Sequence, residues 1–182
     1  MARPPDRGKG HSDKEQNWSI PFDGVYWFFK FPDRQPPAGS YTLSGSPAKT
    51  AFRSSDFVAL QMEARQNFVN PREMSCCSRM EVGISNSDQY PPSVLMDVIL
   101  SDVELPGEPS QSLGRQAVRS IAQRAGESAV QPAHEVVSFA MPEDSKIREF
   151  DAATVKFIRT GGRNFASAKM AIEEFTFVPR GR

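Results

Sequence analysis

The sequence predicts an all-β fold: a two-sheet antiparallel β-sandwich of about eight to ten strands, with at most one or two short helical turns. Two segments near the C-terminus carry this prediction. Residues 153–159 alternate apolar and polar side chains, the period of a strand with one buried face. Residues 168–180 alternate too, but the apolar phase slips at Glu173 and Glu174, as a β-bulge there requires. Pro179 ends this strand because it has no N–H to donate.

The composition agrees with one sandwich domain. A chain of 182 residues fits a single domain, and its 15 Pro and 12 Gly favour many short strands joined by turns. Lys plus Arg and Asp plus Glu each total 22, so the formal net charge is zero. A neutral chain lacks the positive charge of a nucleic-acid binder or of an anionic-membrane binder. No stretch approaches the roughly 18 apolar residues of a membrane span. We therefore predict neither nucleic acid as a partner nor a membrane span.

The N-terminal segment differs from the rest of the chain. Residues 1–17 are polar and have no apolar core, so they do not form a secretory signal. We predict a disordered polar linker there and a single β-sandwich domain over residues 18–182. Two origins fit this pattern: a cytoplasmic protein, or one from which a signal or anchor preceding Met1 has been removed.

The first half of the domain contains a strongly apolar segment. Nearly every residue of 25–31 is large and apolar, which predicts a central strand with both faces covered. Residues 57–65 alternate, and Glu63 and Arg65 lie on the outward face. Further strands are predicted at 41–43, 80–84 and 94–100, with turns at 45–47 and 86–88.

The second half begins with a turn at 106–109. The pattern of residues 112–120 favours a strand followed by a loop after Ala122. The alternative is a short helix that continues to Ala125. Residues 135–139 form a further predicted strand, and 143–151 a segment with one helical turn.

The only cysteines are Cys76 and Cys77, which are adjacent. One interpretation, which we favour on geometric grounds, is a pair of thiols that pack like small apolar residues. The other is a disulfide between neighbours, which is uncommon and tends to be redox-labile. The two histidines, His11 and His134, have no metal-ligand spacing, so no histidine zinc site is predicted.

No sequence motif indicates a reaction. The chain has neither a Gly-x-Ser-x-Gly nucleophile elbow nor a phosphate-binding glycine-rich loop. A glycoside hydrolase would need two facing carboxylates, but solvated charges and cross-strand ion pairs explain the acidic residues more simply. Acidic loops can also hold Ca²⁺, although no spacing indicates it, and we predict no cofactor. The acidic residues considered are Glu63, Asp88, Asp97, Asp102 and Glu104.

The aromatic residues give the best indication of binding. Trp27 belongs to the strongly apolar strand and is predicted to lie in the core, whereas Trp18 and Tyr90 have polar or proline neighbours. Exposed Trp and Tyr rings stack on sugars because C–H bonds meet the negative face of the ring. The predicted ligand-binding set is Trp18, Tyr41, Tyr90, Glu63 and Arg65.

Several segments together resemble a bacterial domain of unknown function that follows a membrane anchor and lies outside the cytoplasm. They are 18–27, 64–68, Cys76-Cys77, 150–157 and 172–180, so the resemblance covers about residues 18–180. It implies a galactose-binding-like jelly roll, a fold shared with carbohydrate-binding modules, and an extracytoplasmic location where disulfides persist. The resemblance assigns no catalytic residues, and this chain departs from it by lacking the membrane anchor.

Together, these observations predict a non-catalytic domain that binds a glycan or a cell-envelope partner. One alternative is a structural or assembly domain of a membrane-tethered envelope protein, which would need an exposed apolar patch or an unpaired edge strand. The other is a carboxylate-dependent glycoside hydrolase or lyase, which would need two carboxylates converging in a cleft.

Overall fold

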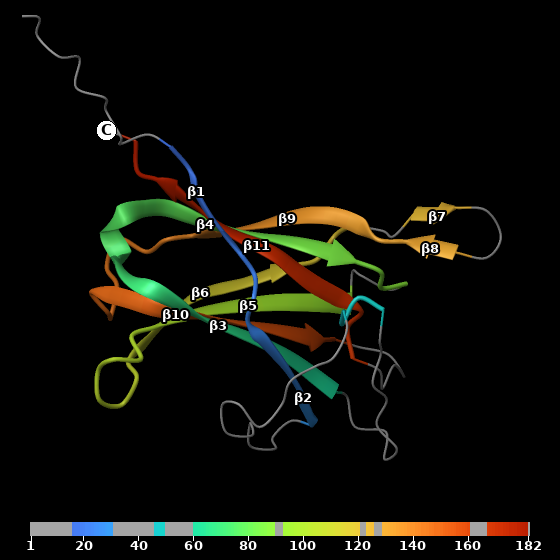
Figure 1. Cartoon of the computed structure of the whole chain (residues 1–182), viewed down its shortest axis with the longest axis horizontal. Helices are drawn as coiled ribbons and strands as arrows, with labels where there is room; N and C mark the ends of the chain where they lie inside the picture. Colours follow the sequence, from blue (N-terminus) through green and yellow to red (C-terminus); the bar gives the residue numbers. More distant parts are fainter. Residues whose placement is uncertain are drawn as a thin grey trace, which may run out of the picture.

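The structure is a computed structural model that describes residues 16–30, 46–49, 60–89, 93–120, 123–125, 129–160 and 167–181. Two antiparallel sheets stack face to face (Figure 1), so the prediction of an all-β sandwich is confirmed. A 3-10 turn at Met74–Cys76 (η1) is the one helical element that lies wholly within these ranges.

One sheet has four strands and the other has five. The four-stranded sheet has the order β1 (Trp18–Pro21), β11 (Met170–Pro179), β4 (Cys77–Asn86) and β9 (Ala133–Ala140). The five-stranded sheet has the order β2 (Val25–Lys30), β3 (Leu60–Glu73), β10 (Glu149–Arg159), β5 (Val94–Ser101) and β6 (Ser110–Ala117). A separate small hairpin is formed by β7 (Gln123–Ala125) and β8 (Ala129–Gln131).

The strand pairs are nested, as in a jelly roll. The first strand, β1, pairs with the last, β11; β3 then pairs with β10, β4 with β9, and β5 with β6. A long antiparallel ribbon of two strands that folds over itself produces this pairing. In this arrangement each successive strand pair lies in the sheet opposite to the pair before it. The additional strand β2 extends the five-stranded sheet beyond β3.

The hydrophobic core lies between the two sheets and is rich in phenylalanine. The Phe68 ring makes edge-on contacts at 6.0–6.1 Å with Phe150, Phe175 and Phe177, so strands of both sheets meet at this one ring. Edge-to-face contacts of this kind stabilise aromatic cores beyond the area that they bury.

The β-bulge predicted from the phase slip is confirmed. The β11–β4 register skips between Ile172 and Glu174, which leaves Glu173 as the extra residue, and β11 ends at Pro179 as predicted. The Leu105–Glu108 turn is closed by a hydrogen bond from Glu108 N–H to Leu105 O, and Gly107 adopts a φ of 79° in it. Residues 112–120 form a strand over most of their length, as favoured.

Some details of the prediction are wrong. Both faces of the strand at 25–31 are covered as predicted, since Tyr26 and Trp27 are buried on opposite faces, but the strand is not central: β2 is the outermost strand of its sheet in the described residues. Buried side chains on both faces therefore did not require two neighbouring strands. No helical turn occurs within 143–151; these residues are irregular up to the start of β10. The region after Ala122 is not only a loop, because it contains β7 and β8.

The strand predicted at 57–65 is longer than expected. Within the described residues β3 runs from Leu60 to Glu73, because it continues as a partner of β10 beyond the end of β2. The predicted strand at 41–43, residues 57–59 and the proposed linker up to residue 15 lie outside the described residues.

Candidate functional site

The chain crosses from one sheet to the other between β1 and β2. Residues 22–24 make this crossing, and Phe22 N–H donates a 2.9 Å hydrogen bond to the carbonyl of the bulged Glu173. The buried Gln66 side chain spans the crossing: its amide donates to Pro21 O at 3.3 Å, and its oxygen accepts from Asp23 N–H at 3.2 Å. These bonds satisfy backbone groups that no longer belong to a sheet ladder.

A cleft of about 310 Å³ opens where β1 separates from β3. Trp18, Ile20 and Pro21 of β1 form one wall, and residues 66–70 with Arg72 of β3 form the other. Phe68 reaches into the core from this wall, whereas Asn67 and Asn70 are exposed. The cleft therefore combines an aromatic ring, carboxamide side chains and a guanidinium group, with the Asp23 carboxylate at its other end.

A large bulge in β3 shapes the outer wall of this cleft. Asn67 lies opposite Ala152 of β10 and Arg72 lies opposite Phe150, so residues 68–71 face only Asp151. At the crest of the bulge Val69 is 97% exposed. Bulges of this kind redirect side chains and are common beside functional sites.

The Trp18 ring is covered on both of its faces. Phe177, its cross-strand neighbour, stacks on it with ring centroids 5.0 Å apart and an interplanar angle of 25°. The guanidinium carbon of Arg72 lies 3.7 Å from the centroid of the ring. Two groups at stacking distance cannot share one face of an indole, so Phe177 and Arg72 occupy opposite faces. Trp18 is thus a support for Arg72 rather than the open stacking platform that we predicted.

The predicted ligand-binding residues do not form one site. Trp18 lines the cleft, whereas Glu63 and Arg65 lie on the outer face of the five-stranded sheet; Tyr41 and Tyr90 lie outside the described residues. Arg65 pairs with Glu108 at 3.4 Å. Glu63 points outward as expected, but it is only 5% exposed, so the expectation of a solvated Glu63 is wrong.

The carboxylates considered for catalysis lie outside the cleft. Lys156 of β10 is directly opposite Glu63 on one side and Asp97 on the other, and Asp97 also pairs with Arg115 at 3.3 Å. Acidic and basic residues therefore alternate across the strands, which is the arrangement that cross-strand ion pairing favours. Asp102 lies in the loop after β5.

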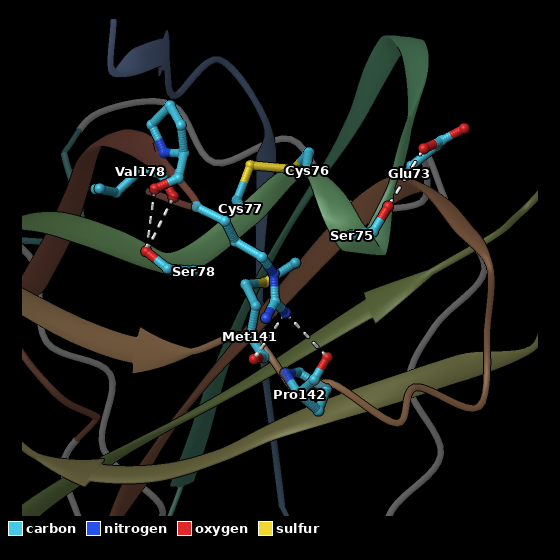
Figure 2. The surroundings of a disulfide bond; sticks show 10 residues. Glu73, Ser75, Cys76, Cys77, Ser78, Met141, Pro142 and Val178 are labelled. Atoms are coloured by element: carbon cyan, nitrogen blue, oxygen red, sulfur yellow. Dashed lines mark hydrogen bonds between the residues drawn. A yellow bond between two sulfur atoms is a disulfide. The ribbon is translucent and has the colours of Figure 1, made fainter. Parts of the chain in front are cut away.

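A second hollow, of about 740 Å³, lies beside the cysteine pair. In the structure Cys76 and Cys77 are joined by a disulfide, so the thiol form that we favoured is not the one observed. Ser78 Oγ donates to the carbonyls of Val178 and Pro179, both at 3.3 Å, next to this disulfide (Figure 2).

Arg180 connects the end of β11 to the wall of this second hollow. Its Nη2 donates to the carbonyls of Met141 and Pro142 at 3.4 Å (Figure 2). Its Nη1 lies 3.6 Å from a carboxylate oxygen of Glu143. Charges of both signs line the hollow, from Glu73 and Glu143 to Lys146, Arg148 and Arg180. This mixture favours no single class of ligand.

The sequence analysis missed the β3 residues of the first cleft, namely Asn67, Asn70 and Arg72. The predicted strand ended at Arg65, because the alternation of apolar and polar residues was followed only that far. In the described ranges, no group of three or more His, Cys, Asp or Glu side chains could hold a metal ion. No helix there is long and apolar enough to cross a bilayer.

No protein-family model, curated protein or solved structure matches this chain. The fold and the two hollows are therefore the observations from which a function can be argued. The resemblance to a galactose-binding-like domain stays a prediction.

Proposed function

We propose that this protein binds a glycan in the cleft between β1 and β3 and does not cleave it. The observation that carries this proposal is the combination of Trp18, Asn67, Asn70 and Arg72 around one hollow at an open side of the sandwich. Sugars present hydroxyl groups around apolar C–H faces. Carboxamides can both donate to and accept from hydroxyls, and the Arg72 guanidinium, supported by Trp18, supplies further N–H donors.

The exposed position of the cleft supports binding to a polymer. Val69 is 97% exposed and Asn70 is exposed as well, so this wall of the cleft is open to solvent and to a ligand longer than the cleft. A volume of about 310 Å³ is near the lower limit of small-molecule sites. The cleft therefore suits one sugar unit of a longer glycan.

The non-catalytic part of the proposal rests on the arrangement of carboxylates. Asp23 is the carboxylate that lines this cleft, and a glycoside hydrolase needs two across the scissile bond. Glu63 and Asp97 lie on a different face, with Lys156 between them.

Affinity electrophoresis through gels that contain single polysaccharides, both neutral and acidic, tests this proposal. We expect at least one polysaccharide to retard the protein, and Asn70→Ala to reduce the retardation by about tenfold in apparent affinity, since one or two hydrogen bonds are lost. Gln116→Ala, on the exposed end of β6, is the matched control and should behave like the wild type. Retardation by no polysaccharide would reject the proposal.

A further inference from the structure

We infer that the glycan carries a carboxylate and that Arg72 binds it. This inference rests on the proposed function and assigns a ligand class to the same cleft. Arg72 is the cation of the cleft, and the central carbon of its guanidinium lies 3.7 Å from the centroid of the Trp18 ring. A cation held over an indole face is attracted by the quadrupole of the ring.

The support beneath Arg72 reaches into the core. Trp18 stacks on Phe177, and Phe177 is packed against Phe68 and Phe150 in the buried cluster. Trp18 is thus held by packing from below, and the exposed Arg72 side chain rests on it. A binding group that is already ordered loses less conformational entropy when a ligand arrives.

Arg72 differs from the other described arginines in its surroundings. Five arginines pair with carboxylates of the protein: Arg65, Arg79, Arg115, Arg159 and Arg180. Within the described part of the chain, the guanidinium group of Arg72 has neither an ion pair nor a hydrogen bond. Among the described arginines that have no carboxylate partner, Arg72 is the one whose guanidinium lies over an aromatic ring. Its N–H donors are therefore available to a ligand.

A carboxylate is the group that matches these donors best. The planar guanidinium offers two parallel N–H groups that a carboxylate accepts in a bidentate arrangement. Asn67 and Asn70 line the same cleft as Arg72 and suit the hydroxyls of a sugar ring. The Asp23 carboxylate at the other end repels an acid, so it favours the orientation in which the acidic group of the ligand faces Arg72.

The experiment compares acidic polysaccharides with their neutral counterparts. The probes are polygalacturonate, alginate and hyaluronate, each beside its methyl-esterified form, which keeps the backbone and removes the charge. We expect calorimetry to show at least one acid form binding about tenfold or more tightly than its ester, because hydrogen bonds to a charged group are stronger than neutral ones. We expect Arg72→Gln to remove this difference, and Arg72→Lys to restore only part of it.

Arg119→Gln is the matched control, because Arg119 is an exposed arginine outside the cleft and the substitution removes the same charge. It should bind within about twofold of the wild type, as expected for a distant charge at physiological salt. Circular dichroism of each variant checks that the sandwich is intact.

The outcomes separate this inference from the proposed function. Equal binding of acids and esters, or unchanged binding by Arg72→Gln, would overturn the role of Arg72 and leave a neutral-glycan site. Binding only to neutral polysaccharides would do the same. Binding to none of the acidic or neutral polymers would overturn both.

Discussion

The carboxylate of Asp88 forms an ion pair with the guanidinium of Arg159, and both side chains are only 3% exposed. Arg159 ends β10 in the five-stranded sheet, whereas Asp88 follows β4 in the four-stranded sheet, so the pair joins the two layers. Asp88 also accepts the backbone N–H of Lys169 at 3.2 Å. The sequence analysis placed Asp88 in a solvated loop, and the structure corrects this.

Replacing Asp88 by Asn should destabilise the protein by about 3–5 kcal/mol, because it removes the negative charge that pairs with the buried Arg159 guanidinium. Urea unfolding followed by circular dichroism measures the change. Arg115→Ala breaks the more exposed pair with Asp97 and should cost no more than about 1 kcal/mol. Equal losses in the two variants would contradict the distinction between buried and exposed pairs.

The alternation of apolar and polar residues along the sequence predicted the strands better than it predicted the burial of individual charged side chains. Alternation identified the strands, and the phase slip at Glu173 identified the bulge, because both are properties of neighbouring residues. Burial of Asp88 and Glu63 depends on contacts with distant parts of the chain, which periodicity does not report. The edge position of β2 was not predicted for the same reason. Trp27 is only 1% exposed, although no second strand pairs with β2 in the described residues, so its burial did not indicate where β2 lies in the sheet.

The hydroxyl of Tyr26 should make the stability fall at high pH. Burial raises the pKa of Tyr26 from 10.0 to about 12, and the 2.9 Å hydrogen bond that Ile172 N–H donates to its oxygen opposes this in part. Between these two values the unfolded chain loses the proton and the folded chain keeps it, so the free energy of unfolding decreases as pH rises. The stabilisation is complete below about pH 10 and is lost by about pH 12, with an upper limit of about 2.7 kcal/mol.

Tyr26→Phe tests this contribution. At neutral pH the variant should lose about 1–3 kcal/mol, because the buried N–H of Ile172 has lost its acceptor. Between about pH 10 and pH 12 its stability should then decrease less steeply than that of the wild type. Urea unfolding at a series of pH values gives both slopes, and parallel slopes would show that Tyr26 does not contribute.

Gly24 should tolerate no side chain at the crossing between the sheets. A Cβ atom there would lie 2.1 Å from the carbonyl oxygen of Arg65 and 2.9 Å from the Phe22 ring. Gly24→Ala must therefore displace β2 from β3 or move the crossing, and we expect a loss of about 1–3 kcal/mol, or more if the backbone cannot yield. Gly181→Ala, where a Cβ meets nothing within 4 Å, is the control and should change thermal stability little. A Gly24→Ala protein as stable as the wild type would contradict the close approach.

The cleft could be predicted only in part. Trp18 was identified because its neighbours are polar, which is a local signal. The contribution of Arg72 depends on a bulge that sets residues 68–71 against Asp151 alone and on the register that brings Phe177 beneath Trp18. Both are relationships between strands that are far apart in the sequence, β3 with β10 and β1 with β11, so no local pattern reveals them.

The disulfide between Cys76 and Cys77 should affect local structure more than global stability. It closes a ring within one dipeptide, and the entropic stabilisation from a disulfide decreases as the closed loop shortens, to about 1 kcal/mol here. Reduction should therefore shift the thermal midpoint only slightly.

The local effect of reduction should appear at the end of β11. The carbonyl of Cys76 accepts Arg180 N–H at 3.5 Å, and the neighbouring Ser78 hydroxyl donates to the carbonyl of Val178. The amide hydrogens at the end of β11 should therefore exchange faster after reduction. Hydrogen-exchange mass spectrometry measures this effect, with a Cys76→Ser, Cys77→Ser double variant as the control for the reductant. Cooperative unfolding of the whole sandwich on reduction would contradict the expectation, since it would make this short ring essential for the fold.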